Sequence, residues 1–242
     1  MSLRILFAAA LAALSLGGCQ RDDAGFDAKV KAYLMAHPDE LRAAVNNMEA
    51  KEQAAEDAAA DQKARAALPA LRGALERDPR DFAANPNGKL TVTEFYDYRC
   101  PHCINLAPKI VGLIHSRPDV RFVFKEMPIF GPTSEHAARA AFAARRQGKD
   151  YVGLYEAFMA ARPLDDAAID RIAASNGVNL AQMNAPATQA ADAQHLNDIS
   201  DLFKNLGFEG TPGFVVGDEF IRGEDYDGLV DAINKAEGKR AG

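Results

Sequence analysis

A strand, a helix and a second strand follow one another between residues 90 and 125, and this order constrains the fold more than any other feature of the chain. Residues 90–98 are rich in β-forming side chains, and residues 120–125 form a second such run. Residues 101–117 have a helical pattern, with Pro108 as a kink. Two strands joined by one helix usually run parallel in the same sheet. The sequence therefore predicts an α/β fold built around a βαβ unit.

The pattern after this unit is mostly helical, over residues 133–147, 150–161, 165–176 and 187–206. A hairpin is predicted over residues 214–221, because Gly217-Asp218 offers turn chemistry between two short apolar runs. A last helix is predicted over residues 226–236. This order fits a thioredoxin fold with a helical subdomain inserted at about residues 133–206. We therefore expect one domain over residues 77–242.

Residues 1–19 have the pattern of a secretion signal and are excluded from the fold. Arg4 precedes an apolar run over residues 5–16, which is shorter than the roughly 20 residues of a membrane span. Residues 16–19, Leu-Gly-Gly-Cys, resemble a bacterial lipobox, in which the cysteine receives lipid. Ordinary cleavage nearby is the alternative. We expect export to the periplasm, with lipidation of Cys19 as a membrane tether under the lipobox interpretation.

Residues 20–76 predict a helical extension followed by a linker. Phe26, Val30, Tyr33 and Leu34 fall on one helical stripe, and a second helix is expected to begin at Pro38. Residues 51–67 favour a helix but have almost no apolar stripe, which predicts a solvated helix or a semi-rigid linker. The stripe should be buried, either against another copy of the chain or against the chain's own domain.

Cys100 and Cys103 are the only cysteines beyond the signal segment. A disulfide that closes so short a loop gains little stability, so a Cys-x-x-Cys in an exported chain indicates redox chemistry. Cys100 ends the predicted strand, and Cys103 lies in the first turn of the helix. The amides and dipole at that helix start favour the Cys100 thiolate, which is the nucleophile in disulfide exchange. Pro101 suits a first turn, and His102 adds a positive charge or a donor beside the sulfur.

Residues 94–103, Glu-Phe-Tyr-Asp-Tyr-Arg-Cys-Pro-His-Cys, resemble the active-site strand and motif of the DsbA-like family, and the similarity covers roughly residues 77–240. The resemblance implies that Cys100 attacks and Cys103 resolves the mixed disulfide. It also implies that Thr211-Pro212 is a cis-proline site where a substrate peptide pairs with the backbone. The family has an acid and a lysine beneath the dithiol, at positions that correspond to Glu94 and Lys125. The implied role of Glu94 is proton exchange with Cys103, and its apolar neighbours on the strand predict a raised pKa.

The helical extension is similar to that of ScsC-like members of the family, which are associated with disulfide isomerisation and copper tolerance. The resemblance implies a homo-oligomer, with a trimer favoured, that acts on proteins with cysteines and is kept reduced by a membrane redox partner. A monomeric oxidase and a copper-binding protein using Cys100, His102 and Cys103 are the alternatives. No cofactor or metal site is predicted, because the other histidines lack a recognisable metal-ligand spacing. The net charge of −6 gives no nucleic-acid footprint.

Overall fold

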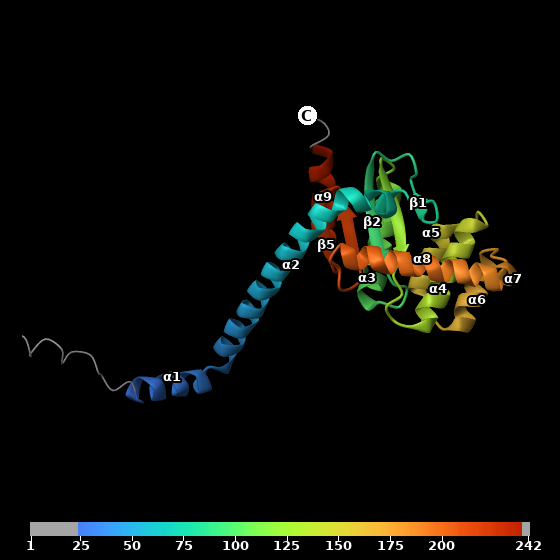
Figure 1. The fold of residues 1–242 in the computed structure, drawn as a ribbon. Coiled ribbons are helices and arrows are strands. Elements are labelled where there is room, and N and C mark those ends of the chain that lie inside the picture. Colours follow the sequence, from blue (N-terminus) through green and yellow to red (C-terminus); the bar gives the residue numbers. More distant parts are fainter. Residues whose placement is uncertain (1–23, 239–242) are drawn as a thin grey trace, which may run out of the picture. The chain divides into compact units, whose positions relative to one another are not determined.

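The structure, a computed structural model, describes residues 24–238 and divides into two compact units, Met1–Glu56 and Asp57–Gly242. Helix α1 (Ala24–Ala36) and the first part of α2 (Pro38–Glu76) belong to the first unit (Figure 1). The break between them falls at His37, as Pro38 predicted. The signal segment and Cys19 lie outside the described residues. Within residues 24–238, no helix combines the length and apolar character needed to cross a membrane.

The second unit is built on a five-stranded sheet with the order β1-β3-β2-β4-β5 (Figure 1). Strands β2 (Leu90–Tyr96) and β3 (Val120–Glu126) are parallel, as the βαβ pattern predicted. Strands β4 (Gly213–Val216) and β5 (Glu219–Arg222) form the predicted hairpin, and β4 pairs antiparallel with β2. Strand β1 (Phe82–Ala84) pairs antiparallel with β3 at the sheet edge. Sequence reasoning missed β1 because three residues are too few for a recognisable period.

Helix α3 (Pro101–Ser116) joins β2 to β3, and α9 (Tyr226–Gly238) closes the chain. The insert between β3 and β4 consists of five helices: α4 (Pro132–Arg146), α5 (Tyr151–Ala160), α6 (Asp166–Ser175), α7 (Leu180–Met183) and α8 (Pro186–Asn205). The expected fold class, a thioredoxin fold with a helical insertion, is therefore confirmed. Only the single-turn helix α7 was not predicted, because four residues carry no helical period.

Alternate side chains of each strand point to opposite faces of the sheet. On β2, Val92 and Tyr96 belong to the core cluster that includes Cys103 and Ile110 of α3. Phe95 points the other way, into a second cluster with Leu68 of α2. The rest of this second cluster comes mainly from α8 and from the segment around β4. The sheet thus has an α3 face, which carries the dithiol, and an α2/α8 face.

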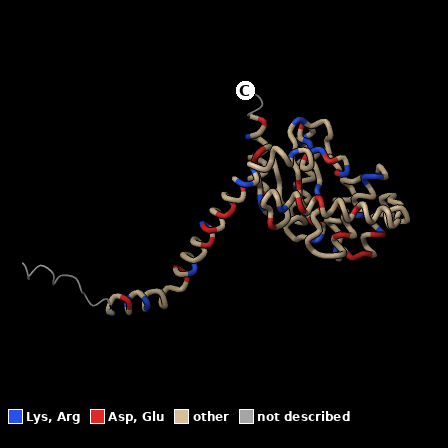
Figure 2. Tube along the Cα trace, in the orientation of Figure 1, with Lys and Arg blue, Asp and Glu red and all other residues tan. Residues whose placement is uncertain are grey.

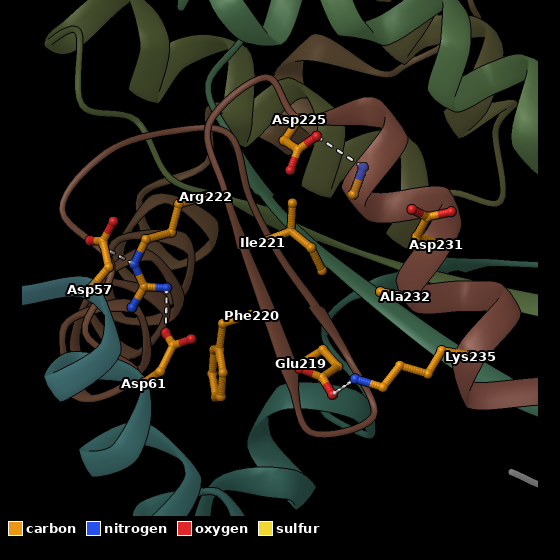
Figure 3. A pocket seen from close by; sticks show the side chains of 11 residues that line it. Asp57, Asp61, Glu219, Phe220, Ile221, Arg222, Asp225, Asp231, Ala232 and Lys235 are labelled. Atoms are coloured by element: carbon orange, nitrogen blue, oxygen red, sulfur yellow. Dashed lines mark hydrogen bonds and ion pairs between the residues drawn. The ribbon is translucent and has the colours of Figure 1, made fainter. Parts of the chain in front are cut away.

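The second half of α2 packs on the domain instead of linking to it. Residues 51–67 are helical and mostly exposed, as expected of a solvated helix, but Ala64 is buried, and Leu68 and Leu75 beyond this stretch pack into the domain, so that residues from Asp57 onward belong to the compact second unit. Two features explain the difference. Ala64 is small enough for the helix to approach the domain closely, and Arg222 of β5 pairs with Asp61, with Nη1 2.9 Å from Oδ1 (Figure 3). The domain therefore begins about 20 residues before the expected boundary at residue 77.

Candidate active site: a dithiol at the start of a helix

The two cysteines lie where β2 gives way to α3, as predicted. Cys100 is the N-cap of α3, and Pro101 occupies its first turn. The backbone bends into the helix around Asp97, whose carboxylate accepts hydrogen bonds from the amides of Arg99 (2.7 Å) and Phe130 (2.9 Å). Both cysteines are buried and are not joined by a disulfide in this structure. The first turn thus holds a nucleophile-bearing side chain against unpaired helix amides.

The site lowers the pKa of Cys100 from 9.0 to about 5. The largest cause is a hydrogen bond from the Cys103 thiol, which outweighs the opposing cost of burial. The backbone amides of Cys103 and His102 add to the effect. Each of these groups stabilises the thiolate more than the thiol. At neutral pH Cys100 is therefore an anion, which is the reactive form in disulfide exchange.

The same geometry acts in the opposite direction on Cys103. Its side chain is fully buried, and burial raises the pKa of its thiol far above the ordinary value. The hydrogen bond that it donates to Cys100 raises the pKa further, since the proton stabilises the neighbouring thiolate. The two cysteines, one helical turn apart, thus have thiol pKa values shifted in opposite directions. Cys103 needs a base before it can act as a nucleophile.

Thr211 lies directly against Cys100, and Pro212 follows it in the chain. The Thr211-Pro212 peptide bond is cis, as the resemblance implied. The Cys100 sulfur lies 3.2 Å from the Thr211 carbonyl oxygen, and the Gly223 amide donates to the Pro212 carbonyl at 2.9 Å. This second bond ties the proline segment to the end of β5. The segment enters β4 beside the dithiol.

His102 turns its side chain outward from the first turn of α3 and is largely exposed. Its Nδ1 lies 3.1 Å from a carboxylate oxygen of Glu224, in the segment between β5 and α9. Asn105 makes a longer contact, 3.5 Å, with the same oxygen. Sequence reasoning did not identify Glu224, because nothing in its neighbourhood indicates contact with a residue more than 120 positions earlier.

Glu94 is buried on the α3 face, as its position between Val92 and Tyr96 predicted. Burial raises the pKa of its carboxyl to about 8, and an interaction with the Tyr155 hydroxyl only partly opposes this. Neither carboxyl oxygen has a hydrogen bond of normal length within residues 24–238. The Cys103 thiol lies within electrostatic range of Glu94. A carboxyl in this state takes up and releases a proton near neutral pH.

Lys125 does not share this site. It pairs in register with Phe95, so its side chain points to the α2/α8 face, away from Glu94 and the dithiol. Its Nζ donates to the Ala74 carbonyl oxygen at 2.6 Å and forms a buried ion pair with Asp81. His195 completes the group, with Nε2 3.1 Å from the second Asp81 oxygen. The expectation that an acid and a lysine lie together beneath the dithiol is corrected, because a residue at this register falls on the opposite face.

A second buried acid, Glu126, takes the place on the α3 face that we had expected Lys125 to occupy. It pairs in register with Tyr96, two residues beyond Glu94 on the same face. The same alternation that identified Glu94 would have identified Glu126 once the register of β2 and β3 was known. In the part of the chain that the structure describes, no group of three or more His, Cys, Asp or Glu side chains is arranged to hold a metal ion.

A cavity of about 420 Å³ lies between α2, β5 and α9 (Figure 3). It is lined by several carboxylates together with Arg222 and Lys235, and Glu219 pairs with Lys235 at 2.7 Å. None of the dithiol residues lines it. Most of its charges are already paired with one another, so we assign it no part in the dithiol chemistry.

Residues 91–234 match the family described as the DSBA-like thioredoxin domain. The chain belongs to the DsbA-like thioredoxin-domain family. It is 26% identical over 160 residues to the thiol:disulfide interchange protein DsbA of Bordetella pertussis (strain Tohama I), a match that covers 61% of this chain and 75% of that protein. Together with the dithiol geometry, this membership identifies the chain as a thiol–disulfide oxidoreductase.

Solved structures of DsbA-like proteins superpose on most of the chain. A thioredoxin-like oxidoreductase from Silicibacter pomeroyi DSS-3 is 37% identical, with a TM-score of 0.62, and covers 69% of this chain and 98% of its own. Proteus mirabilis ScsC in a transitional conformation is 26% identical, with a TM-score of 0.65, and covers 90% and 97%. Salmonella enterica Typhimurium BcfH is 29% identical, with a TM-score of 0.63, and covers 88% and 95%. The ScsC and BcfH matches thus extend over more of this chain than the 69% covered by the oxidoreductase.

Proposed function

We propose that the chain is an exported protein disulfide isomerase of the ScsC type that works as a homo-oligomer. In this proposal Cys100 attacks a substrate disulfide, Cys103 resolves the mixed disulfide, and His102 and Pro101 support the thiolate from the first turn of α3. Thr211 and Pro212 bind the substrate backbone beside Cys100. The substrates are proteins with cysteines, and a membrane redox partner returns the dithiol to its reduced state.

The observation that carries the oligomer is an exposed apolar stripe on α1 and the start of α2. Its members are spaced three or four residues apart for the most part and are all exposed in the single chain: Phe26, Val30, Tyr33, Leu34, Leu41, Val45 and Met48. A stripe of this size in water favours association, and a helix of this length is marginal on its own. A second copy offers the same stripe, so packing between copies buries both. The resemblance to ScsC-like proteins favours three copies.

The charge pattern supports the same occupant. Basic and acidic side chains are interspersed along the first part of α2 (Figure 2). Mixed charges beside an apolar stripe are typical of helices that pair with helices of similar sequence, and they do not form the single-sign face that attracts an oppositely charged partner. We therefore infer that the stripe is covered by copies of this chain.

Reactive Cys100 thiolates on several subunits suit an isomerase, which must attack wrong disulfides from the reduced state. A thiolate with a low pKa is also a good leaving group, so a substrate is readily released. The alternative, a monomeric DsbA-type oxidase, is favoured by the match to the Bordetella pertussis protein. The copper alternative has no comparable support, since His102 is directed toward Glu224 and not toward the two sulfurs.

We place the protein in the periplasm, where disulfide exchange on secreted proteins takes place. The support is the signal-like segment over residues 1–19 together with the DsbA-like family. Attachment to the membrane through lipidated Cys19 is part of the proposal and rests on the lipobox pattern alone.

Sedimentation and reactivation of scrambled ribonuclease together test the proposal. The wild-type chain should sediment as an oligomer and reactivate scrambled ribonuclease. The double variant Leu34→Asp/Val45→Asp should sediment as a monomer and lose most isomerase activity, because it places charge in the stripe. Lys51→Asp is the matched control, since it adds an aspartate to an exposed position in the charged part of α2 and should change neither property.

Two results would contradict this proposal. A monomeric wild-type chain that oxidises reduced substrates rapidly would favour the oxidase alternative. Wild-type activity in a monomeric double variant would show that isomerisation needs no second dithiol.

A further inference from the structure

The Arg222 side chain, at the end of β5, joins helix α2 to residues 207–213, the segment that leads into β4. It pairs with two carboxylates of α2: Nη1 lies 2.9 Å from an Asp61 oxygen, and Nε lies 3.6 Å from an Asp57 oxygen (Figure 3). The same guanidinium contacts the 207–213 segment, because Nη2 donates to the Gly207 carbonyl oxygen at 3.3 Å and the guanidinium carbon lies 5.1 Å from the centre of the Phe208 ring. The side chain is only 22% exposed.

The 207–213 segment also contacts α2 directly, at Gly207. This residue has a φ of +70°, in the region that favours glycine, and a Cβ placed on it would lie 3.3 Å from the Ala60 Cβ. The absence of a side chain thus lets the turn after α8 approach α2 closely. Helix α2 therefore positions this turn in two ways, by contact at Ala60 and through Arg222.

The other end of the segment is held by Arg222 and by the residue that follows it. Arg222 pairs in register with Gly213, and the Gly223 amide donates to the Pro212 carbonyl oxygen at 2.9 Å. The Phe208 ring packs on Gly213 so closely that a Cβ there would come within 2.7 Å of the ring. Phe208, near the start of the segment, thus contacts both Arg222 and the end of the segment. Both ends therefore depend on one arginine and its strand neighbour.

The 207–213 segment includes Thr211, whose carbonyl oxygen lies 3.2 Å from the Cys100 sulfur. A peptide that pairs with Thr211 as an added strand bonds to its backbone, so recognition depends on where that backbone lies. Backbone hydrogen bonds weaken steeply once their angle or distance departs from the normal range. A contact that fixes the segment therefore determines how firmly a substrate backbone is held beside Cys100.

We propose that Arg222 is a positioning residue for this substrate-binding segment, and that Asp57 and Asp61 of α2 orient it. The inference rests on the binding of the substrate backbone by Thr211 and Pro212 proposed above. A guanidinium is a rigid planar fork, so carboxylates that hold part of it direct its remaining donor at the segment. Without them the long side chain regains its rotamer freedom. The part of α2 in the second unit thus contributes to substrate binding as well as to attachment of the helix.

A purely structural role for Arg222 makes a different prediction. Ion pairs between partly exposed side chains contribute little stability, so loss of such a pair would leave the rates for all disulfides unchanged or lower them together. Loss of the position of the segment lowers only the rate for substrates that pair with its backbone. The role belongs to the Arg222 side chain and not to the cavity that it lines.

The test is the single-turnover reaction of the full-length reduced protein with a short cysteine peptide activated as its pyridyl disulfide. The Cys100 thiolate attacks the peptide sulfur, the Cys100–peptide disulfide forms, and the bond to thiopyridine breaks. Cys100 is oxidised, and thiopyridine leaves with the electron pair and is followed by its absorbance. The matched substrate is the same peptide with the amides beside its cysteine N-methylated, which removes their hydrogen-bond donors. For the wild type at pH 7, the second-order rate constant should be about tenfold higher for the unmodified peptide, as expected for one or two backbone hydrogen bonds.

Two variants should lose most of this preference for the unmodified peptide. Arg222→Met removes the guanidinium and keeps an unbranched side chain. The double variant Asp57→Asn/Asp61→Asn keeps Arg222 and removes the charges of its α2 partners. Asp231→Asn is the matched control, because Asp231 lines the same cavity from α9, and it should keep the wild-type preference.

The double variant changes two partly exposed side chains, so it keeps the test decisive if Arg222→Met does not fold. A wild-type preference in either folded variant would overturn the proposal, and so would rates for the two peptides that fall together. A wild-type protein with no preference between the peptides would instead refute backbone binding at Thr211, and this inference with it. Release of thiopyridine from neither peptide would refute the exchange chemistry of Cys100 itself.

Discussion

The low pKa of Cys100 couples ionisation of one sulfur to the stability of the reduced protein. The folded state holds this pKa at about 5, whereas a thiol in the unfolded chain keeps its ordinary value of 9.0. Because the folded pKa is lowered, the stabilisation is fully present above pH 9 and is lost as the pH falls through 5. Each pH unit in this window is equivalent to about 1.4 kcal/mol. At pH 7, two units above the folded pKa, ionisation of Cys100 should therefore stabilise the reduced protein by about 3 kcal/mol.

Cys100→Ser supplies the comparison, since it removes the ionisation and leaves the other titrating groups in place. The free energy of unfolding in urea should be measured for reduced wild type and for the variant between pH 5 and 8. The difference between the two proteins should widen as the pH rises, by about 1.4 kcal/mol per unit. A difference that stays constant across this range would refute the assignment of a thiolate to Cys100. Thiolate absorbance of the folded wild type gives an independent measure, with a midpoint near pH 5 expected.

Two further substitutions distinguish the catalytic role of Glu94, on the α3 face, from the structural role of Lys125, on the α2/α8 face. Glu94→Gln should slow the release of thionitrobenzoate from its mixed disulfide with Cys100 by about 10²-fold at pH 8, because Cys103 loses its proton acceptor. The same variant should abolish the inflection in the pH dependence of this rate. A pH profile that matches the wild type would exclude this role of Glu94. Lys125→Met should instead lower the free energy of unfolding by about 3–5 kcal/mol, because it leaves the buried Asp81 carboxylate without its ammonium partner. The pH titration of Cys100 should stay as in wild type. A shifted Cys100 titration would place Lys125 in the dithiol site after all.

The order of the main elements could be predicted because each has a clear period or a clear stop. β2, α3 and β3 alternate between periods, and Pro38 separates α1 from α2. The dithiol could be located because a Cys-x-x-Cys after a strand leaves little choice of position. Short elements were lost for the opposite reason. β1 is held at the sheet edge by pairing with β3, a long-range interaction that three residues do not encode locally.

The packing of α2 shows a second limit. Residues 51–67 have a composition that suits a solvated helix, and the attachment of the part from residue 57 onward depends on partners far along the chain. Ala64 is buried only because the domain offers a surface that fits a small side chain, and Asp61 is held only because Arg222 lies opposite. Composition measures how much apolar surface a helix brings, whereas attachment depends on what the neighbouring surface supplies.

The sequence analysis assigned Glu94 to the correct face of the sheet but Lys125 to the wrong one, and the cause is the register of two strands. Glu94 could be assigned to the α3 face from the alternation of β2 alone. Lys125 needed the pairing of β2 with β3 as well, because a shift of one residue sends a side chain to the other face. The observed register pairs Lys125 with Phe95, and so it removes the lysine from the dithiol side. The same register brings Glu126 in beside Tyr96. The α3 face of these two strands therefore carries two buried acids, Glu94 and Glu126, whereas Lys125 lies on the α2/α8 face, so any proton acceptor for Cys103 on this face must be sought among carboxyls and not in an acid–lysine pair.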